Sequence, residues 1–204
     1  AGQRPVIDCQ QAGRAFYFGS GETKDSVIDN FTIKNGKKDG TSYPDNAGGA
    51  ILCENNSSPT IINCTFSGNS ANGDGGAIYC DSSGSPSITN CTFSGNSADS
   101  GGAIHCDFSS SPTLNNCILW GNSASNGDEV YVSSSSSCTL NYCCVDNTGY
   151  GGYTGNIDDS NNCIHLEPKF ACVEAGVLRL KHDSPCIDAG DNSLVPVGVT
   201  TDII

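Results

Sequence analysis

A repeat of 26 or 27 residues constrains the fold of this chain more than any other feature of its sequence. Each copy opens with the tetrapeptide Gly-Gly-Ala-Ile, and the three strict copies begin at Gly48, Gly75 and Gly101. A second apolar segment follows in each copy and ends in a Gly-Asn pair, at Asn69, Asn96 and Asn122. A fixed period of this length is typical of a stacked array in which each repeat contacts only its neighbours.

Constant and variable residues alternate in the first segment, as they do along a β-strand. The constant positions hold an isoleucine and, two residues later, a cysteine: Ile51 and Cys53, Ile78 and Cys80, Ile104 and Cys106. We expect these side chains to point into a core. The position between them holds Leu52, Tyr79, His105 and, in a weaker copy, Tyr131. Because this column varies, we expect it to face water.

The second segment changes face part-way along. Ile88 and Phe93 are both apolar but lie an odd number of residues apart, so one residue between them must break the alternation. An Asn-Cys pair stands at this point in each copy, at residues 63–64, 90–91 and 116–117. We expect a bend or bulge there, with the asparagine in a corner where its amide bonds the backbone and its neighbours above and below.

Each repeat is therefore expected to form two or three short strands joined by Gly, Ser and Asn turns. No repeat can bury its apolar face alone, whereas parallel strands stacked about 4.8 Å apart bury it between coils. The predicted fold class is all-β, a single-stranded parallel β-helix with coils of about 26 residues. We predict one domain over residues 1–204, with the first coils at 1–47, regular coils at 48–145, and irregular last coils with a partial cap at 146–204.

The chain contains 13 cysteines, an odd number, so at least one has no disulfide partner within a monomer. In the repeats, cysteine is replaced singly by Phe18, Phe31 or Val132, which predicts buried free thiols that act as small core side chains. The absence of a Cys-x-x-Cys pair argues against a metal site. Beyond the repeats a disulfide would stabilise loops, and we predict that Cys172 pairs with Cys186.

An acidic residue follows the first cysteine of each strict copy, giving the column Glu54, Asp81 and Asp107. Carboxylates one coil apart lie roughly 5 Å from each other, and they repel unless a cation or a shared proton intervenes. Calcium favours such oxygen-rich groups, and the spacing resembles the paired carboxylates of retaining glycosidases. The simplest interpretation is that these acidic residues keep an exposed turn soluble.

A column of rings stands beside the acidic column, at Tyr79, His105 and Tyr131. Stacked rings on a flat face can dock sugar rings. They are also what the surfaces of β-sheets ordinarily carry. The sequence therefore leaves open whether these residues bind a ligand.

Basic residues are absent from a large part of the chain. The formal net charge is −13, and no Lys or Arg occurs from Asp39 to Pro168. Phosphate binding needs clustered basic residues, so we predict no binding of nucleic acid. Lyases that act on acidic polysaccharides need a cationic group to stabilise the developing enolate. The regular coils have no Lys or Arg side chain to supply it. The sequence has no run of about 18 apolar residues, so we predict no membrane insertion by this chain.

Two sets of motifs resemble those of known proteins. Gly-Gly-Ala-Ile together with Phe-x-x-Asn, at residues 66–69 and 93–96, resembles the paired motifs of the polymorphic outer-membrane protein repeat family. More broadly, the chain resembles right-handed parallel β-helix proteins of bacterial and archaeal surfaces. Residues 184–192, Ser-Pro-Cys-Ile-Asp-Ala-Gly-Asp-Asn, resemble the tail of secreted β-helix proteins that carry a sorting anchor. The resemblance implies a right-handed coil and a secreted or cell-surface protein.

We predict a structural or adhesive protein without catalytic activity. Uncapped strand edges invite pairing with another copy, and head-to-tail contacts that do not close give filaments, so the chain itself is the expected partner. One alternative is a protein that binds or cleaves surface glycans through Glu54, Asp81, Asp107 and the column of rings. A second alternative is a calcium-stabilised surface module, and no other cofactor is predicted.

Overall fold

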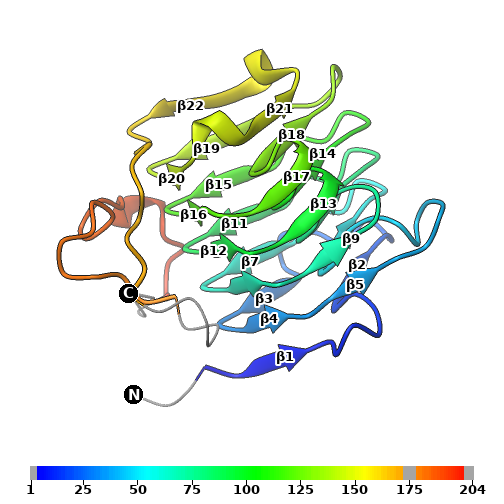
Figure 1. Cartoon of the computed structure of the whole chain (residues 1–204), viewed down its shortest axis with the longest axis horizontal. Coiled ribbons are helices and arrows are strands. Elements are labelled where there is room, and N and C mark those ends of the chain that lie inside the picture. The colour runs from blue at the N-terminus through cyan, green and yellow to red at the C-terminus, as the bar shows by residue number, and fades with distance from the viewer. Residues whose placement is uncertain (1–3, 172–177, 200–204) are drawn as a thin grey trace.

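The computed structural model of the protein describes residues 4–171 and 178–199. The described chain winds into a stack of coils whose strands form four sheets along the stack (Figure 1). Strands of successive coils pair in parallel throughout these sheets. The predicted parallel β-helix is therefore confirmed.

Three sheets contain six strands each. Sheet A consists of β1 (Val6–Asp8), β4 (Thr32–Lys34), β8 (Thr65–Ser67), β12 (Thr92–Ser94), β16 (Ile118–Leu119) and β20 (Cys144–Val145). Sheet B consists of β2 (Phe16–Phe18), β6 (Ile51–Cys53), β10 (Ile78–Cys80), β14 (Ile104–Cys106), β18 (Val130–Val132) and β21 (Tyr150–Gly152). Sheet C consists of β3 (Val27–Asp29), β7 (Thr60–Ile62), β11 (Ser87–Thr89), β15 (Thr113–Asn115), β19 (Cys138–Asn141) and β22 (Ile157–Asn161).

A fourth sheet was not expected, because we predicted two or three strands per coil. Sheet D consists of β5 (Lys37–Lys38), β9 (Ser70–Ala71), β13 (Ser97–Ser100) and β17 (Ser123–Asn126). Its strands are built mainly from Ser, Ala and Asn, so they show no apolar alternation to reveal them. The described residues also include the 3₁₀-helices η1 (Asn147–Gly149), η2 (Thr154–Asn156) and η3 (Asn192–Leu194).

The core lies inside the stack and follows the predicted inward positions. Ile78 pairs with Ile51 on one side and Ile104 on the other, and all three are fully buried. The rings of Phe66 and Phe93 stack with centroids 4.7 Å apart and planes 3° from parallel. Like side chains in successive coils therefore pack directly on each other.

The predicted bend between sheets C and A is also confirmed. Asn63 and Asn90 have φ angles of 54° and 53°, the left-handed conformation that turns the chain at a corner. The Asn90 Nδ2 donates to Asn63 Oδ1 at 3.2 Å, and Asn63 Nδ2 donates to Asp29 Oδ1 at 2.9 Å. The side-chain amides therefore bond along the stack, as expected.

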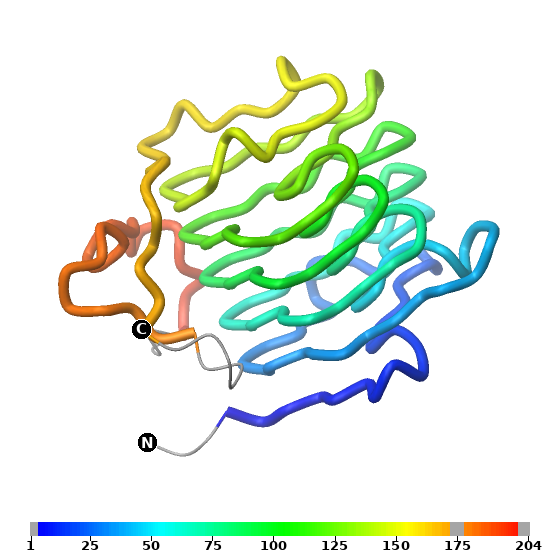
Figure 2. The backbone as a smooth tube through the Cα atoms, in the orientation of Figure 1, coloured from blue at the N-terminus to red at the C-terminus, as the bar shows by residue number. Residues whose placement is uncertain are grey.

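After β22 the chain leaves the stack and runs back along its side (Figure 2). Ile164 still bridges to Cys144 in parallel. The part that follows lies beside the strands of sheet A rather than over the last coil (Figure 1). We refer to residues 178–199 as the C-terminal segment.

Neighbouring coils approach closely at the second glycine of the repeat. A Cβ atom on Gly76 would lie 2.2 Å from the carbonyl O of Gly102 and 2.7 Å from backbone atoms of Ser97. Such contacts are with backbone, which cannot turn aside as a flexible side chain can. The glycine is therefore required by the spacing of the coils.

Gly76→Ala is expected to lower the free energy of unfolding by about 2–3 kcal/mol, because two coils must shift apart to accept the methyl group. The measurement is chemical denaturation. Gly155→Ala is the control, since a Cβ there would meet no atom within 4 Å; its change should stay within about 0.5 kcal/mol. Equal stability of the two variants would contradict the close contact.

Candidate functional site

The column predicted to face water is mostly buried, so this expectation was wrong. Leu52, Tyr79 and His105 each expose at most 4% of their surface, and only Tyr131 is partly exposed. These side chains do leave sheet B on the side away from the main core. The loops that connect sheet D to sheet B fold back over them and exclude water.

Residues of these loops contact the column directly. Tyr43, between β5 and β6, places its ring edge-on to Tyr79 at 6.0 Å between centroids. His105 Nδ1 lies 3.2 Å from Asp74 Oδ1 and 3.3 Å from the carbonyl O of Ser100. Burial raises the pKa of the Tyr79 phenol, which is therefore neutral. The column forms a small second core that holds the loops, and it offers no open platform for a sugar ring.

The acidic column is assembled as predicted, but its carboxylates are bonded internally. Glu54 and Asp81 are buried, and Asp107 is half-buried. Glu54 accepts a hydrogen bond from the Tyr17 hydroxyl. Asp81 and Asp107 each accept from the backbone N–H of the following residue, at 2.7 and 2.8 Å. Burial raises the pKa of Asp81, and the charge of Asp107 raises it further.

These carboxylates therefore stabilise the turn that follows sheet B. Among residues 4–171 and 178–199, no group of three or more His, Cys, Asp and Glu side chains is arranged to hold a metal ion. Calcium binding by Glu54, Asp81 and Asp107 stays a prediction.

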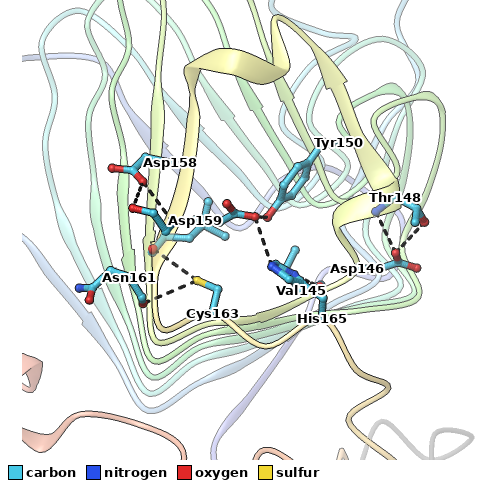
Figure 3. A network of polar contacts seen from close by, with 11 residues as sticks. Val145, Asp146, Thr148, Tyr150, Asp158, Asp159, Asn161, Cys163 and His165 are labelled. Carbon is cyan, nitrogen blue, oxygen red and sulfur yellow. Dashed lines mark hydrogen bonds and ion pairs between the residues drawn. The ribbon is translucent and has the colours of Figure 1, made fainter.

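A polar cluster that sequence reasoning missed covers the end of the core at the last coil (Figure 3). The Tyr150 hydroxyl donates to Asp159 Oδ2 at 3.0 Å, and His165 Nε2 lies 3.5 Å from the same oxygen. His165 Nδ1 lies 3.1 Å from the carbonyl O of Val145. The signal in the sequence was a phenol at the position that Val130 holds one coil earlier.

The polar groups of this cluster serve as hydrogen-bond partners for one another. Burial raises the pKa of Tyr150, and the nearby Asp159 carboxylate raises it further, so the phenol keeps its proton and donates it. Each member is held by another member or by backbone. The cluster therefore closes the apolar core with groups that tolerate water, at the level where no further isoleucine follows.

A ladder of buried asparagines runs along the corner between sheets A and D. The backbone N–H and Nδ2 of Asn69 both donate to Asn96 Oδ1, at 3.1 and 2.9 Å, and Asn96 bonds Asn122 in the same way. Asn96 Nδ2 also donates to the carbonyl O of Phe66 at 3.0 Å. The Phe-x-x-Asn motif thus provides both a stacked ring and a rung of this ladder.

The ladder ends on a carboxyl group. Glu129 accepts from the backbone N–H of Asn122 at 3.3 Å and from its Nδ2 at 2.5 Å. It stands one repeat after Ala103 and is 2% exposed. Burial raises the pKa of Glu129 to about 7, although the hydrogen bonds from Asn122 oppose the shift. Sequence reasoning missed this residue, whose signal was an acid at an alanine position.

All twelve cysteines that the structure describes are free, as predicted for the repeats. Burial raises the pKa of Cys91 and Cys117 well above its usual range, so these thiols act as core side chains. Cys172 lies outside the described residues, and its pairing with Cys186 stays a prediction. Cys186 lines the same cavity as Cys144 in β20.

The arrangement of coils agrees with a comparison at the level of families. A family model for the right-handed β-helix region matches residues 19–175, more than half of the chain. The chain belongs to the right-handed β-helix family. No curated protein and no solved structure shows significant similarity to this β-helix.

A β-helix fold does not determine an activity, so function has to be argued from the surfaces of this β-helix. No helix among its described residues has the length and apolar character needed to cross a membrane. Two of the three rings of the predicted ligand column are buried, and the carboxylates beside them are bonded internally. The two ends of this β-helix and the flank beside sheet A are surfaces outside these two columns.

Glu129→Gln is expected to remove a pH dependence of stability from this β-helix. The carboxyl group ionises near pH 4.5 in the unfolded chain but stays protonated up to about pH 7 in the folded protein. Between these values only the folded state holds the proton, so the free energy of unfolding falls as pH rises, by about 3 kcal/mol in all. Urea denaturation across this pH range measures the slope, which the glutamine variant should lose.

Glu167→Gln is the matched control, because it removes a carboxyl group from an exposed position. It should keep the slope of the unsubstituted protein. A slope that persists unchanged in Glu129→Gln would mean that other groups carry the pH dependence.

Proposed function

We propose that this β-helix is a structural protein of the cell surface or the extracellular space that associates end to end with copies of itself. The observation that carries the proposal is the state of the strand edges. Among the described residues, no strand lies beyond β1, β2 and β3 at one end of the stack, and none lies over β21 and β22 at the other (Figure 1). The backbone N–H and C=O groups on the free side of an edge strand form a row that can pair with a strand of another chain.

Two of the edge strands at this end also carry exposed apolar side chains. Val6 in β1 and Val27 in β3 expose 55% and 56% of their surface. In the middle coils a neighbouring strand covers both sides of each strand. A further coil from a second copy would cover these edges in the same way, and parallel sheets would continue from one copy into the next.

Charge is distributed along the stack in a way that favours contact between opposite ends. Residues 4–38 contain six Lys and Arg against four Asp and Glu, whereas residues 144–163 contain three Asp and no Lys or Arg. Opposite potentials at two ends steer their encounter and disfavour contact between like ends. The expected association is therefore head to tail, which gives filaments when it does not close into a ring.

Two further features support a role outside the cell. Residues 39–168 contain no Lys or Arg, so proteases that cleave after basic residues have no site in the regular coils. The Gly-Gly-Ala-Ile and Phe-x-x-Asn motifs resemble polymorphic outer-membrane protein repeats, and this resemblance also supports a role outside the cell. The burial of Tyr79 and His105 leaves the glycan-binding alternative with less support.

Charge reversal at each end tests the proposal. The first variant carries Asp158→Lys and Ser160→Lys at exposed positions of β22, and the second carries Lys24→Glu and Lys37→Glu near the opposite end. Each variant alone should self-associate at least about tenfold more weakly than the unsubstituted chain, because like charges then meet. An equimolar mixture should assemble, since each end finds an opposite charge. Analytical ultracentrifugation and electron microscopy measure the outcome.

A matched control is available in the middle of the stack. Ser97→Lys with Asp99→Lys makes the same substitutions at exposed positions of β13 and should leave assembly unchanged. An unsubstituted chain that stays monomeric over a wide range of concentration would contradict the proposal. A mixture of the two end variants that fails to assemble would contradict the head-to-tail geometry.

A further inference from the structure

The C-terminal segment is held against the flank of the stack beside sheet A. Asn116, at the corner between sheets C and A, donates from Nδ2 to the carbonyl O of Asp191 at 3.0 Å. The Asp191 N–H in turn donates to Asn116 Oδ1 at 2.9 Å. A cavity of about 630 Å³ lies beside this contact, and Thr92, Ile118 and Cys144 from sheet A line one side of it.

A cysteine of the C-terminal segment also lines this cavity. Cys186, in the C-terminal segment, is 7% exposed, and Cys144 is 3% exposed. The two thiols are close enough to influence each other, because the Cys186 thiol raises the pKa of Cys144 and the Cys144 thiol lowers the pKa of Cys186. Two thiols that are 42 residues apart in the sequence therefore line one cavity at the junction of the stack and the C-terminal segment.

We propose that Cys144 and Cys186 form a disulfide bond that fastens the C-terminal segment to sheet A. The bond would close a long loop of the chain, the case in which a disulfide restricts the open state most. It would also keep the apolar flank residues of sheet A covered when the segment would otherwise detach.

The reaction is an exchange with a small-molecule disulfide such as oxidised glutathione. The Cys186 thiolate attacks one sulfur of that disulfide, forms a mixed disulfide and releases one glutathione thiolate. The released thiolate takes the proton of Cys144, whose sulfur then attacks Cys186 and displaces the second glutathione, which is protonated by water. Two protein thiols are oxidised, and one small disulfide is reduced to two thiols.

The same reaction is disfavoured for the cysteines inside the repeats. Cys91 and Cys117 also line the cavity, but each is 1% exposed, and burial raises the pKa of both thiols well above its usual range. The thiolate is the reactive form of cysteine, so a thiol with a lowered pKa reacts first. Cys186 is the most exposed of the four cysteines that line this cavity, at 7%, and its pKa is lowered.

A tryptic map distinguishes the possible partners of Cys186. Trypsin cleaves after Lys and Arg, so Cys144 lies in the fragment 39–169, Cys172 in 170–179 and Cys186 in 182–204. The full chain is incubated with oxidised glutathione, unfolded with an alkylating reagent that blocks free thiols, and digested without reductant. The expected product is fragment 182–204 linked to 39–169 and released by reductant.

Two variants identify the cysteine within the large fragment. Cys144→Ser should abolish the link to fragment 182–204, whereas Cys163→Ser, at a partly exposed cysteine in the same fragment, should keep it. A link from Cys186 to fragment 170–179, an alkylated Cys186, or a link that survives in Cys144→Ser would each overturn the proposal.

Proteolysis of the native protein tests whether the disulfide bond holds the C-terminal segment against sheet A. Cleavage at the exposed Arg179 and Lys181 should become about tenfold slower after oxidation, because the segment must detach to enter a protease. Cys163→Ser should show the same protection, and Cys144→Ser should show none. Equal cleavage rates in the reduced and oxidised protein would overturn the proposed fastening of the segment.

Discussion

One-to-one register between successive coils is the constraint on which the rest of the structure depends. Because parallel ladders pair Ile78 with Ile51 and Ile104, each position of the repeat becomes a column of like side chains. Columns suit residues that interact well with their own kind, such as the stacked rings of Phe66 and Phe93. A slip by one residue would turn every inward column outward, so the register is strongly specified.

The same columns explain why much of the fold could be predicted. Period-2 alternation indicated which side chains enter the core, and an odd spacing between apolar residues indicated the corner that Asn63 and Asn90 form. The free thiols followed from the replacement of cysteine by Phe and Val. Sheet D was missed because a strand of small polar residues, such as β13, has no pattern that distinguishes it from a turn.

The candidate site was predicted less well, because it depends on contacts between segments that do not share the repeat. Tyr79 and His105 are covered by Tyr43 and Asp74, which lie in loops of unequal length. A column read in isolation gives no sign of such a cover. The cluster of Tyr150, Asp159 and His165 forms where the period is lost, so no neighbouring copy predicts the position of its members.

The asparagine ladder makes each coil an interchangeable unit of length. Asn69 and Asn96 make the same bonds: each Nδ2 donates to the asparagine Oδ1 of the next coil and to a backbone carbonyl of the preceding coil. A duplicated coil would meet matching donors below and acceptors above. Gene duplication can therefore lengthen the molecule by about 4.8 Å per coil while its ends and its flank stay unaltered.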